Sequence, residues 1–215
     1  MSVLANNFET LEEQRALYPR VSDIIGKQNA DELRSVPIDT LYNACIRGTK
    51  VHEYCTAFAK SLWIPDIESE YKPYVESFEE WSAKYVESYD RLSERLYDDE
   101  RMFTGEFDMI VNLKDGRRAL IDIKTSSAKS KSWPIQLAAY AHLCKLYGYE
   151  FDVVLNLHLK KTQAALYEEK EGEKLLVSPL KAKACEIMYD DLKPYWEIFS
   201  SSLKCYDYFC RKGGK

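Results

Sequence analysis

The sequence predicts an α/β (α+β) fold in which a mixed β-sheet is flanked by helices. Apolar residues recur in steps of three and four over 38–62, which is the period of a helix. Apolar and polar residues alternate over 103–113 and again over 118–124, with a short turn between them, which is typical of a β-hairpin. Helical and strand-like segments follow in turn, and this order favours helices packed on a mixed sheet.

The composition is that of a globular chain. Hydrophobic residues are 46% and aromatic residues 13% of the 215 residues, which excludes disorder over most of the chain. No apolar run is long enough to span a bilayer, and no secretory or transit pattern opens the sequence, so we expect a cytoplasmic protein, in the host cytoplasm if a phage encodes it. The net charge of −5 argues against a protein that coats nucleic acid without specificity, although it is compatible with a local basic patch.

We expect a single domain over 1–215, made of a helical N-terminal part (1–86), a sheet core (87–168) and a long C-terminal helix (179–209). Pro37 opens the first long helix, and a further helix starts near Ser132 and is stopped by Gly148. The apolar stripe of the first helix is Leu41, Cys45, Gly48, His52, Cys55, Ala59 and Leu62. The six cysteines form no CxxC pair, which indicates reduced thiols and leaves open whether any of them binds a metal or cluster.

The register of the hairpin decides which side chains share a face. With a two-residue turn, Asp108 would lie opposite Ile123. With a three-residue loop over 114–116, Gly116 is left-handed and Asp108 lies opposite Asp122. We expect the second register, because it gathers six apolar side chains on one face: Phe107, Met109, Val111, Ala119, Ile121 and Ile123.

Two carboxylates side by side on a sheet repel each other, so something must offset their charge. A divalent cation does so, because hard cations prefer carboxylate oxygens. Lys124 follows Asp122 by two residues and therefore shares its face. This lysine can either neutralise the acids or orient and deprotonate a water that attacks a phosphodiester.

An ordered set of segments resembles the PD-(D/E)xK nuclease superfamily, and most closely its RecB-like branch of phage-type and mitochondrial-type exonucleases. The segments are Gly105-Glu106-Phe107-Asp108, Ile121-Asp122-Ile123-Lys124-Thr125-Ser126 and Gln136-Leu137-Ala138-Ala139-Tyr140. Upstream, 47–52 is similar to a helical motif that ends in histidine, and 18–25 to the opening of phage-type members. The resemblance covers about residues 18–160, and no proline precedes Asp108, as is common in this branch.

The resemblance implies a restriction-endonuclease-like sheet and a role for each matching position. Asp108, Asp122, the backbone carbonyl of Ile123 and His52 would bind Mg2+ or Mn2+. Lys124 would position the attacking water and stabilise charge in the transition state. Gln136 and Tyr140 would face the site from their helix. Glu94 is a further candidate, because it matches a strand glutamate upstream of Asp108. The residues that would contact phosphates are Thr125, Ser126, Lys129 and Lys131.

Each candidate also has a plain structural interpretation. His52 and Tyr140 can be buried core residues, and Asp108 and Asp122 can be acids that face solvent. The lysines at 129, 131, 160 and 161 can form either a phosphate-binding rim or an ordinary solvated face. Trp63, Trp81 and Trp133 can stack on bases or pack in the core.

The sequence therefore predicts a metal-dependent DNA nuclease with Mg2+ or Mn2+ as its cofactor. An exonuclease that acts on single- or double-stranded DNA ends in recombination, repair or phage DNA processing is preferred. An endonuclease of the same fold, a catalytically decayed DNA-binding protein and a helical interaction protein stay open as alternatives. A protein of a recombination or replication complex is a further expected partner, and no membrane association is expected. Polarity, strand preference, DNA versus RNA and oligomeric state stay open.

Overall fold

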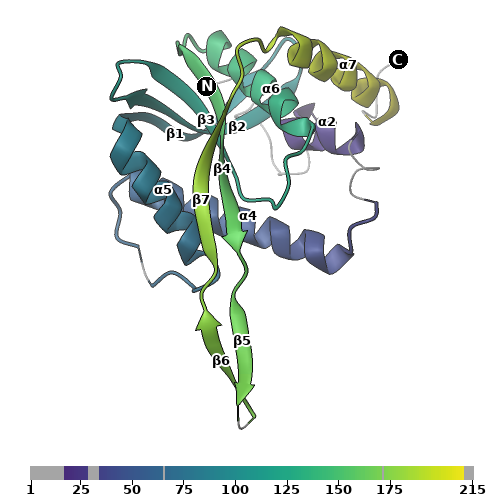
Figure 1. Ribbon diagram of the computed structural model, residues 1–215. Coiled ribbons are helices and arrows are strands. Elements are labelled where there is room, and N and C mark those ends of the chain that lie inside the picture. The colour runs from purple at the N-terminus through teal and green to yellow at the C-terminus, as the bar shows by residue number, and fades with distance from the viewer. Residues whose placement is uncertain (1–16, 29–33, 65, 171, 211–215) are drawn as a thin grey trace.

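The computed structural model describes residues 17–28, 34–64, 66–170 and 172–210 (Figure 1). The elements are α2 (Val21–Gln28), α4 (Ile38–Ala59), α5 (Lys72–Tyr85), β1 (Val86–Asp98), β2 (Phe103–Leu113), β3 (Arg118–Lys124), α6 (Ser132–Leu146), β4 (Val153–Gln163), β5 (Leu166–Lys170), β6 (Glu173–Ser178), β7 (Lys181–Met188) and α7 (Lys193–Cys210). Residues 1–16 of the expected helical N-terminal part lie outside the described residues.

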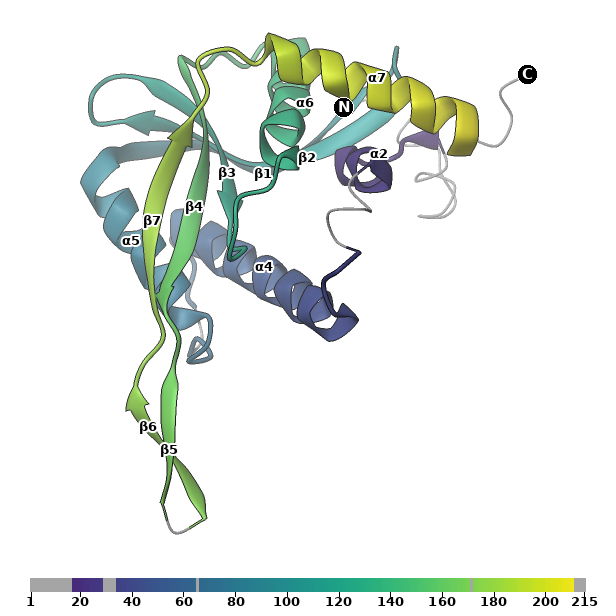
Figure 2. The ribbon, with the colours of Figure 1, turned by 45° about the vertical axis from the view of Figure 1, so that its right-hand side comes forward.

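A five-stranded mixed sheet in the order β1-β2-β3-β4-β7 forms the centre of the fold. Only the β3–β4 pair is parallel, because α6 carries the chain back across one face of the sheet between these two strands. Helices α2, α6 and α7 cover that face, and α4 and α5 cover the other (Figure 2). The expected helix-flanked mixed sheet is therefore confirmed. No described helix combines the length and apolar character needed to cross a membrane.

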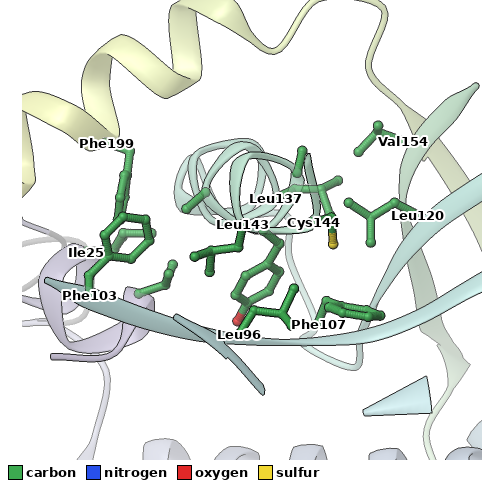
Figure 3. Close-up of a cluster of buried hydrophobic side chains, with 14 of the residues drawn as sticks. Ile25, Leu96, Phe103, Phe107, Leu120, Leu137, Leu143, Cys144, Val154 and Phe199 are labelled. Atoms are coloured by element: carbon green, nitrogen blue, oxygen red, sulfur yellow. The ribbon is translucent and has the colours of Figure 1, made fainter. Parts of the chain in front are cut away.

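Two hydrophobic cores lie on the two faces of the sheet. Figure 3 shows the first, where Leu137 and Leu143 of α6 pack with Phe103, Leu120 and other strand residues, and Phe199 of α7 closes one side. The second core joins side chains from α4 and α5 to the opposite face of β2, β3 and β4. Its members include Val51, Cys55, Phe78, Met109, Val111, Ile121 and Leu157.

The β2–β3 hairpin has the expected three-residue loop. The N–H of Leu113 donates to the carbonyl of Arg117 at 2.8 Å, and Gly116 has a φ of +86°. Met109 pairs with Ile121, and the pairs continue in step to the loop. Carrying this register one residue further places Asp108 opposite Asp122, but the strand pairing itself stops at Met109.

The expected single apolar face of the hairpin is wrong at one position. Phe107 packs in the α6-side core, whereas Met109 and Val111 pack in the α4/α5-side core. The alternation of inward and outward side chains along β2 therefore shifts by one residue at Asp108. There the Asp108 carboxylate accepts the N–H of Ile123 on β3. The predicted stripe of the first helix also needs correction, because Cys45 and Leu62 are exposed.

The C-terminal helix is shorter than the predicted 179–209. Residues 181–188 form β7, so the sheet extends beyond the expected boundary at 168, and the helix begins only at Lys193. Alternation explains the difference, because Ala182 and Ala184 pack on the α4/α5-side core while Lys181 and Lys183 are exposed. Asp191 accepts the N–H of Lys193 at 2.8 Å and marks the helix start.

Candidate active site

The candidate site lies where the pairing of β2 and β3 ends. His52 reaches it from α4 and Asp108 from β2, while Asp122 and Lys124 come from the last residues of β3. The fold brings together residues that are up to 72 positions apart, because strands β2 and β3 open at this point and α4 crosses beside the opening.

Asp108 is held by a backbone donor and by a histidine. Its Oδ2 accepts the N–H of Ile123 at 2.6 Å, and its Oδ1 lies 3.0 Å from Nδ1 of His52. Burial acts to raise the pKa of Asp108, but His52, Lys124 and the Ile123 N–H stabilise the charged form and hold the pKa below its ordinary value. Burial acts to lower the pKa of His52, yet the Asp108 carboxylate raises it above its ordinary value.

Asp122 is more deeply buried, with 4% of its side chain exposed against 17% for Asp108. Its Oδ2 lies 2.7 Å from Nζ of Lys124 and accepts from Nδ2 of Asn156 at 2.6 Å. Burial, reinforced by the charge of Asp108, raises the pKa of Asp122 above its ordinary value. The two acids of the site are therefore shifted in opposite directions.

Asn156 and Tyr189 are site residues that sequence reasoning missed. The parallel register places Asn156 directly beside Asp122, and the hydroxyl of Tyr189 donates to Oδ1 of Asn156 at 2.8 Å. The alternation over 151–158 predicts a strand, but no local signal fixes which neighbour this strand pairs with after the α6 crossover. The partner of Asp122 therefore emerges only from the three-dimensional structure.

Lys124 is held in place by two residues of α6. Its Nζ donates to Oε1 of Gln136 at 2.7 Å, and Nε2 of Gln136 donates to the Tyr140 hydroxyl at 2.7 Å. Burial raises the pKa of Tyr140, so the phenol stays neutral. The ring of Tyr140 packs on Gly105, where an added Cβ would lie 2.8 Å from it, and this close approach explains the glycine three residues before Asp108.

His52, Asp108, Asp122 and Lys124 form one electrostatic cluster, because the charge of each affects the pKa of at least one other member. In the described part of the chain, no three His, Cys, Asp or Glu side chains converge closely enough to hold a metal ion as they stand. Lys124 instead places positive charge beside Asp122, and His52 lies beside Asp108 as a hydrogen-bond partner. The donor types nevertheless fit a hard divalent cation, which prefers carboxylate and carbonyl oxygens.

A cleft of about 640 Å3 opens beside Asp108 and His52, between α4 and strands β1 and β2. Its charged lining residues include Glu53, Glu106 and Lys60, and the two glutamates form ion pairs with Lys50 and Arg95. An anionic substrate that approaches from this side meets the charge of Asp108 itself and therefore needs positive charge beside this acid.

The remaining candidates are spread around the cluster. Thr125 is buried, and the Ser126 hydroxyl donates to the Ala128 carbonyl at 2.8 Å, while Lys129 and Lys131 are exposed on the loop that leads to α6. Glu94 pairs with Phe107 on β2, and its carboxylate accepts from the Tyr149 hydroxyl at 2.8 Å rather than joining the bonds around Asp108 and Lys124. Trp81 and Trp133 are core residues, whereas Trp63 is exposed.

Comparison with known proteins identifies a similar fold but no family. No protein-family model matches the chain, and no curated protein matches it. Among solved structures, the chain is similar to a crystal structure from Eubacterium rectale that is described as a "Putative exonuclease". The two share 13% sequence identity with a TM-score of 0.50, and the match covers 95% of this chain and 84% of that one. At this identity the likeness establishes the fold, a helix-flanked mixed sheet.

Proposed function

We propose that the protein is a metal-dependent nuclease that hydrolyses phosphodiester bonds in DNA. The observation that carries this proposal is the cluster of His52, Asp108, Asp122 and Lys124 at the opening of β2 and β3, beside a cleft. The pKa of one acid is lowered and that of the other is raised, and Lys124 bonds both to Asp122 and to Gln136 of α6. Neighbouring acids with pKa values shifted in opposite directions are typical of catalytic sites. The resemblance of the motifs and the similar fold point to the same class.

Asp108 and Asp122, with the Ile123 carbonyl and His52, are the residues that would hold Mg2+ or Mn2+. When bound, such an ion supplies Lewis-acid polarisation of the phosphate and lowers the pKa of a water. The position suits a cation, because the two acids lie in a largely water-excluded place, where Asp122 attracts the ammonium group of Lys124 and Asp108 holds the His52 ring.

The protein's own residues would then position the reactants. The oxygen of the attacking water forms a bond to phosphorus, the bond from phosphorus to the leaving oxygen breaks, and that oxygen takes up a proton. Lys124 would keep its proton at Nζ and stabilise the added negative charge of the transition state. Gln136 is a positioning residue, because it acts through the 2.7 Å hydrogen bond that fixes the lysine, and Tyr140 in turn fixes Gln136. Thr125, Ser126, Lys129 and Lys131 would contact flanking phosphates.

We favour an exonuclease over an endonuclease, because the motif resemblance is strongest to exonucleases and the similar solved structure is described in the same words. DNA ends would be the substrate, a protein of a recombination or replication complex a further partner, and the cytoplasm the compartment. A comparison of linear and closed circular DNA tests the preference. Efficient cutting of closed circles would favour the endonuclease.

The central experiment is a time course on end-labelled single- and double-stranded oligonucleotides with Mn2+, with Mg2+ and with EDTA. We expect cleavage that needs the metal and that Asp122→Asn abolishes, because this change removes a ligand charge while it keeps the shape. DNA that stays intact but bound in the presence of either metal would favour the decayed DNA-binding protein.

Lys124→Ala separates catalysis from metal binding. We expect kcat to fall by roughly 100-fold or more, while calorimetry with Mn2+ shows affinity close to wild type, because Lys124 contributes transition-state charge stabilisation rather than a ligand. Loss of Mn2+ binding in this variant would contradict the role assigned to Lys124.

A further inference from the structure

Strands β4 and β7 extend beyond the other strands of the sheet and continue into the β5–β6 hairpin (Figures 1 and 2). Together they form a two-stranded ribbon that projects from the body of the protein. Nearly every described side chain of β5 and β6 is exposed, so the hairpin has no core of its own. An isolated two-stranded ribbon is only marginally stable, which suggests that it contacts a partner.

Lysines gather at the neck of this ribbon, where β4 and β7 leave the sheet. Lys160 pairs directly with Lys183, and Lys181 pairs with Gln163 two residues further out. All three lysines are exposed, and the ion pairs among the described residues do not engage them. Like charges directly opposite each other on a sheet are destabilising, so this arrangement costs stability unless an anion is bound.

These three lysines, the lysine strip, lie on one face of the ribbon. Leu155, Leu157 and Leu159 of β4 pack in the α4/α5-side core, so the residues between them face the other way. Asn156, which contacts Asp122, and His158 are two of these, and Lys160 is the next. The lysine strip therefore continues the face on which Asp122 meets Asn156.

His158 links the strip to the loop after β3. Its Nε2 donates to the carbonyl of Ser126 at 2.7 Å, and its ring contacts Trp133. Burial lowers the pKa of His158, and the charges of Lys160 and Lys129 lower it further, which places both lysines near this ring. The charges of Lys160 on β4 and of Lys129 on the loop before α6 therefore both act on the ring of His158.

The tip of the hairpin has a different charge pattern. Glu169 pairs with Lys174, and Lys170 pairs with Glu173, so opposite charges face each other across the two strands there. Lys161 belongs to neither arrangement, because it pairs with Ala182 and therefore faces the α4/α5 side. The like-charge pair of Lys160 and Lys183 thus lies on one face of the neck with Lys181, and Lys161 lies on the other face.

We propose that the lysine strip of Lys160, Lys181 and Lys183 binds the phosphate backbone of DNA next to the bond that is cleaved. This inference rests on the proposed function and adds to it the position of the flanking nucleic acid. Lys160 lies four residues beyond Asn156 on β4, or about 13 Å. This span corresponds to about four base pairs of duplex. A polyanion fits the strip better than a second copy of the chain, which would bring lysine against lysine.

Binding of a fluorescein-labelled 20-base-pair duplex, measured by anisotropy, tests the strip. All variants are made in the Asp122→Asn background, so that the DNA stays intact. We expect Lys160→Ala/Lys181→Ala/Lys183→Ala to weaken binding about tenfold or more at 100 mM KCl. The slope of log K against log salt should fall by roughly 2 to 3, because each phosphate contact contributes about 0.9.

Lys161→Ala is the matched control, since it removes one charge from the same strand on the opposite face. We expect its Kd to stay within twofold, whereas Lys160→Ala alone weakens binding severalfold. Thermal unfolding should show that the triple variant is folded and no less stable, because a like-charge pair has been removed. A triple variant that binds as its parent does, equal effects of Lys160→Ala and Lys161→Ala, or no binding by the parent would each overturn the inference.

The binding result is independent of cleavage. If the strip variants weaken binding but the wild-type protein cleaves nothing with either metal, the strip stands and the nuclease proposal fails. If the wild-type protein cleaves DNA and the strip variants bind normally, the nuclease proposal stands and the strip fails.

Discussion

Two aspartate–histidine pairs of nearly equal length occur among the residues that the structure describes, and their surroundings differ. In the first, Asp98 Oδ2 lies 2.8 Å from Nε2 of His142, and only 1% of the aspartate side chain is exposed. Asp98 also accepts the backbone N–H of Arg101 at 2.8 Å and meets its guanidinium at 3.3 Å. His142 stacks on Trp196 with ring centroids 4.0 Å apart. Donors and rings surround this pair.

The second pair, Asp108 with His52, has a second acid beside it and opens to the cleft. No arginine appears among its described contacts, and 32% of the His52 side chain is exposed. The comparison teaches that an aspartate–histidine contact alone does not define a site. Asp98 is satisfied by the fold, whereas the Asp108 side of the cluster keeps negative charge that a ligand can use.

Among the changes that compare the two pairs, Asp108→Asn should give the largest effect. We expect the cleavage rate to fall by roughly 1000-fold, because the proposed metal ligand loses its charge. The thermal midpoint should stay near wild type, because asparagine can still accept the Ile123 N–H. Single-turnover cleavage and thermal unfolding measure the two quantities. A rate within tenfold of wild type would remove Asp108 from the site.

Asp98→Asn should show the opposite pattern. The free energy of unfolding should fall by about 2–3 kcal/mol, because charge-assisted contacts to His142 and Arg101 are lost in a buried place. Activity per folded molecule should stay within twofold. Urea denaturation and the cleavage rate per folded molecule test this prediction. A variant that is folded but inactive would show that the two pairs do not differ in role.

The histidines extend the comparison with smaller effects. His52→Ala should lower cleavage by about 10- to 100-fold, as expected for loss of a ligand or of a group that orients one. His142→Ala should leave cleavage unchanged and cost about 1–2 kcal/mol, since Trp196 loses its stacking partner. Parallel activity and denaturation measurements on both variants are needed. Equal losses of activity would show that the pairs are not distinct in role.

Acid titration gives the smallest effect. The pKa of Asp98 lies below its ordinary value of 3.8, because its bonds to His142 and Arg101 outweigh the opposing effect of burial. Its stabilisation is therefore present above pH 3.8 and is lost as the pH falls through the lower folded-state pKa. The difference in unfolding free energy between wild type and Asp98→Asn should shrink below pH 3.8. A difference that grows with acidity would contradict this linkage.

Local signals predicted part of this structure well. The alternation of β2 and β3 and the left-handed Gly116 lie within 22 residues, so the loop and the register follow from neighbouring residues alone. The sequence did not predict the strand over 181–188, because its alternation is short and its lysines and alanines also favour a helix. The segment becomes a strand because it pairs with β4, and local patterns in the sequence do not reveal this partner.

The site was predictable only where its residues lie in motifs. Lys124, Gln136 and Tyr140 lie within 17 positions of one another, and the structure joins them by hydrogen bonds. Their proposed catalytic roles stay predictions. Asn156 and Tyr189 reach Asp122 through the crossover and through a loop after β7. Contacts of this kind depend on strand order, which single-sequence patterns do not encode.

The contact between Tyr189 and Asn156 has a consequence for synthesis. Asp122 accepts from the Asn156 amide, and that amide accepts from the Tyr189 hydroxyl, so this chain of hydrogen bonds is complete only when residue 189 has been made. During translation, the earlier motifs emerge from the ribosome without the amide that binds this carboxylate and without the hydroxyl that binds the amide. The growing polypeptide therefore holds Asp122 with fewer hydrogen bonds than the folded protein does until β4 and the loop after β7 have joined it.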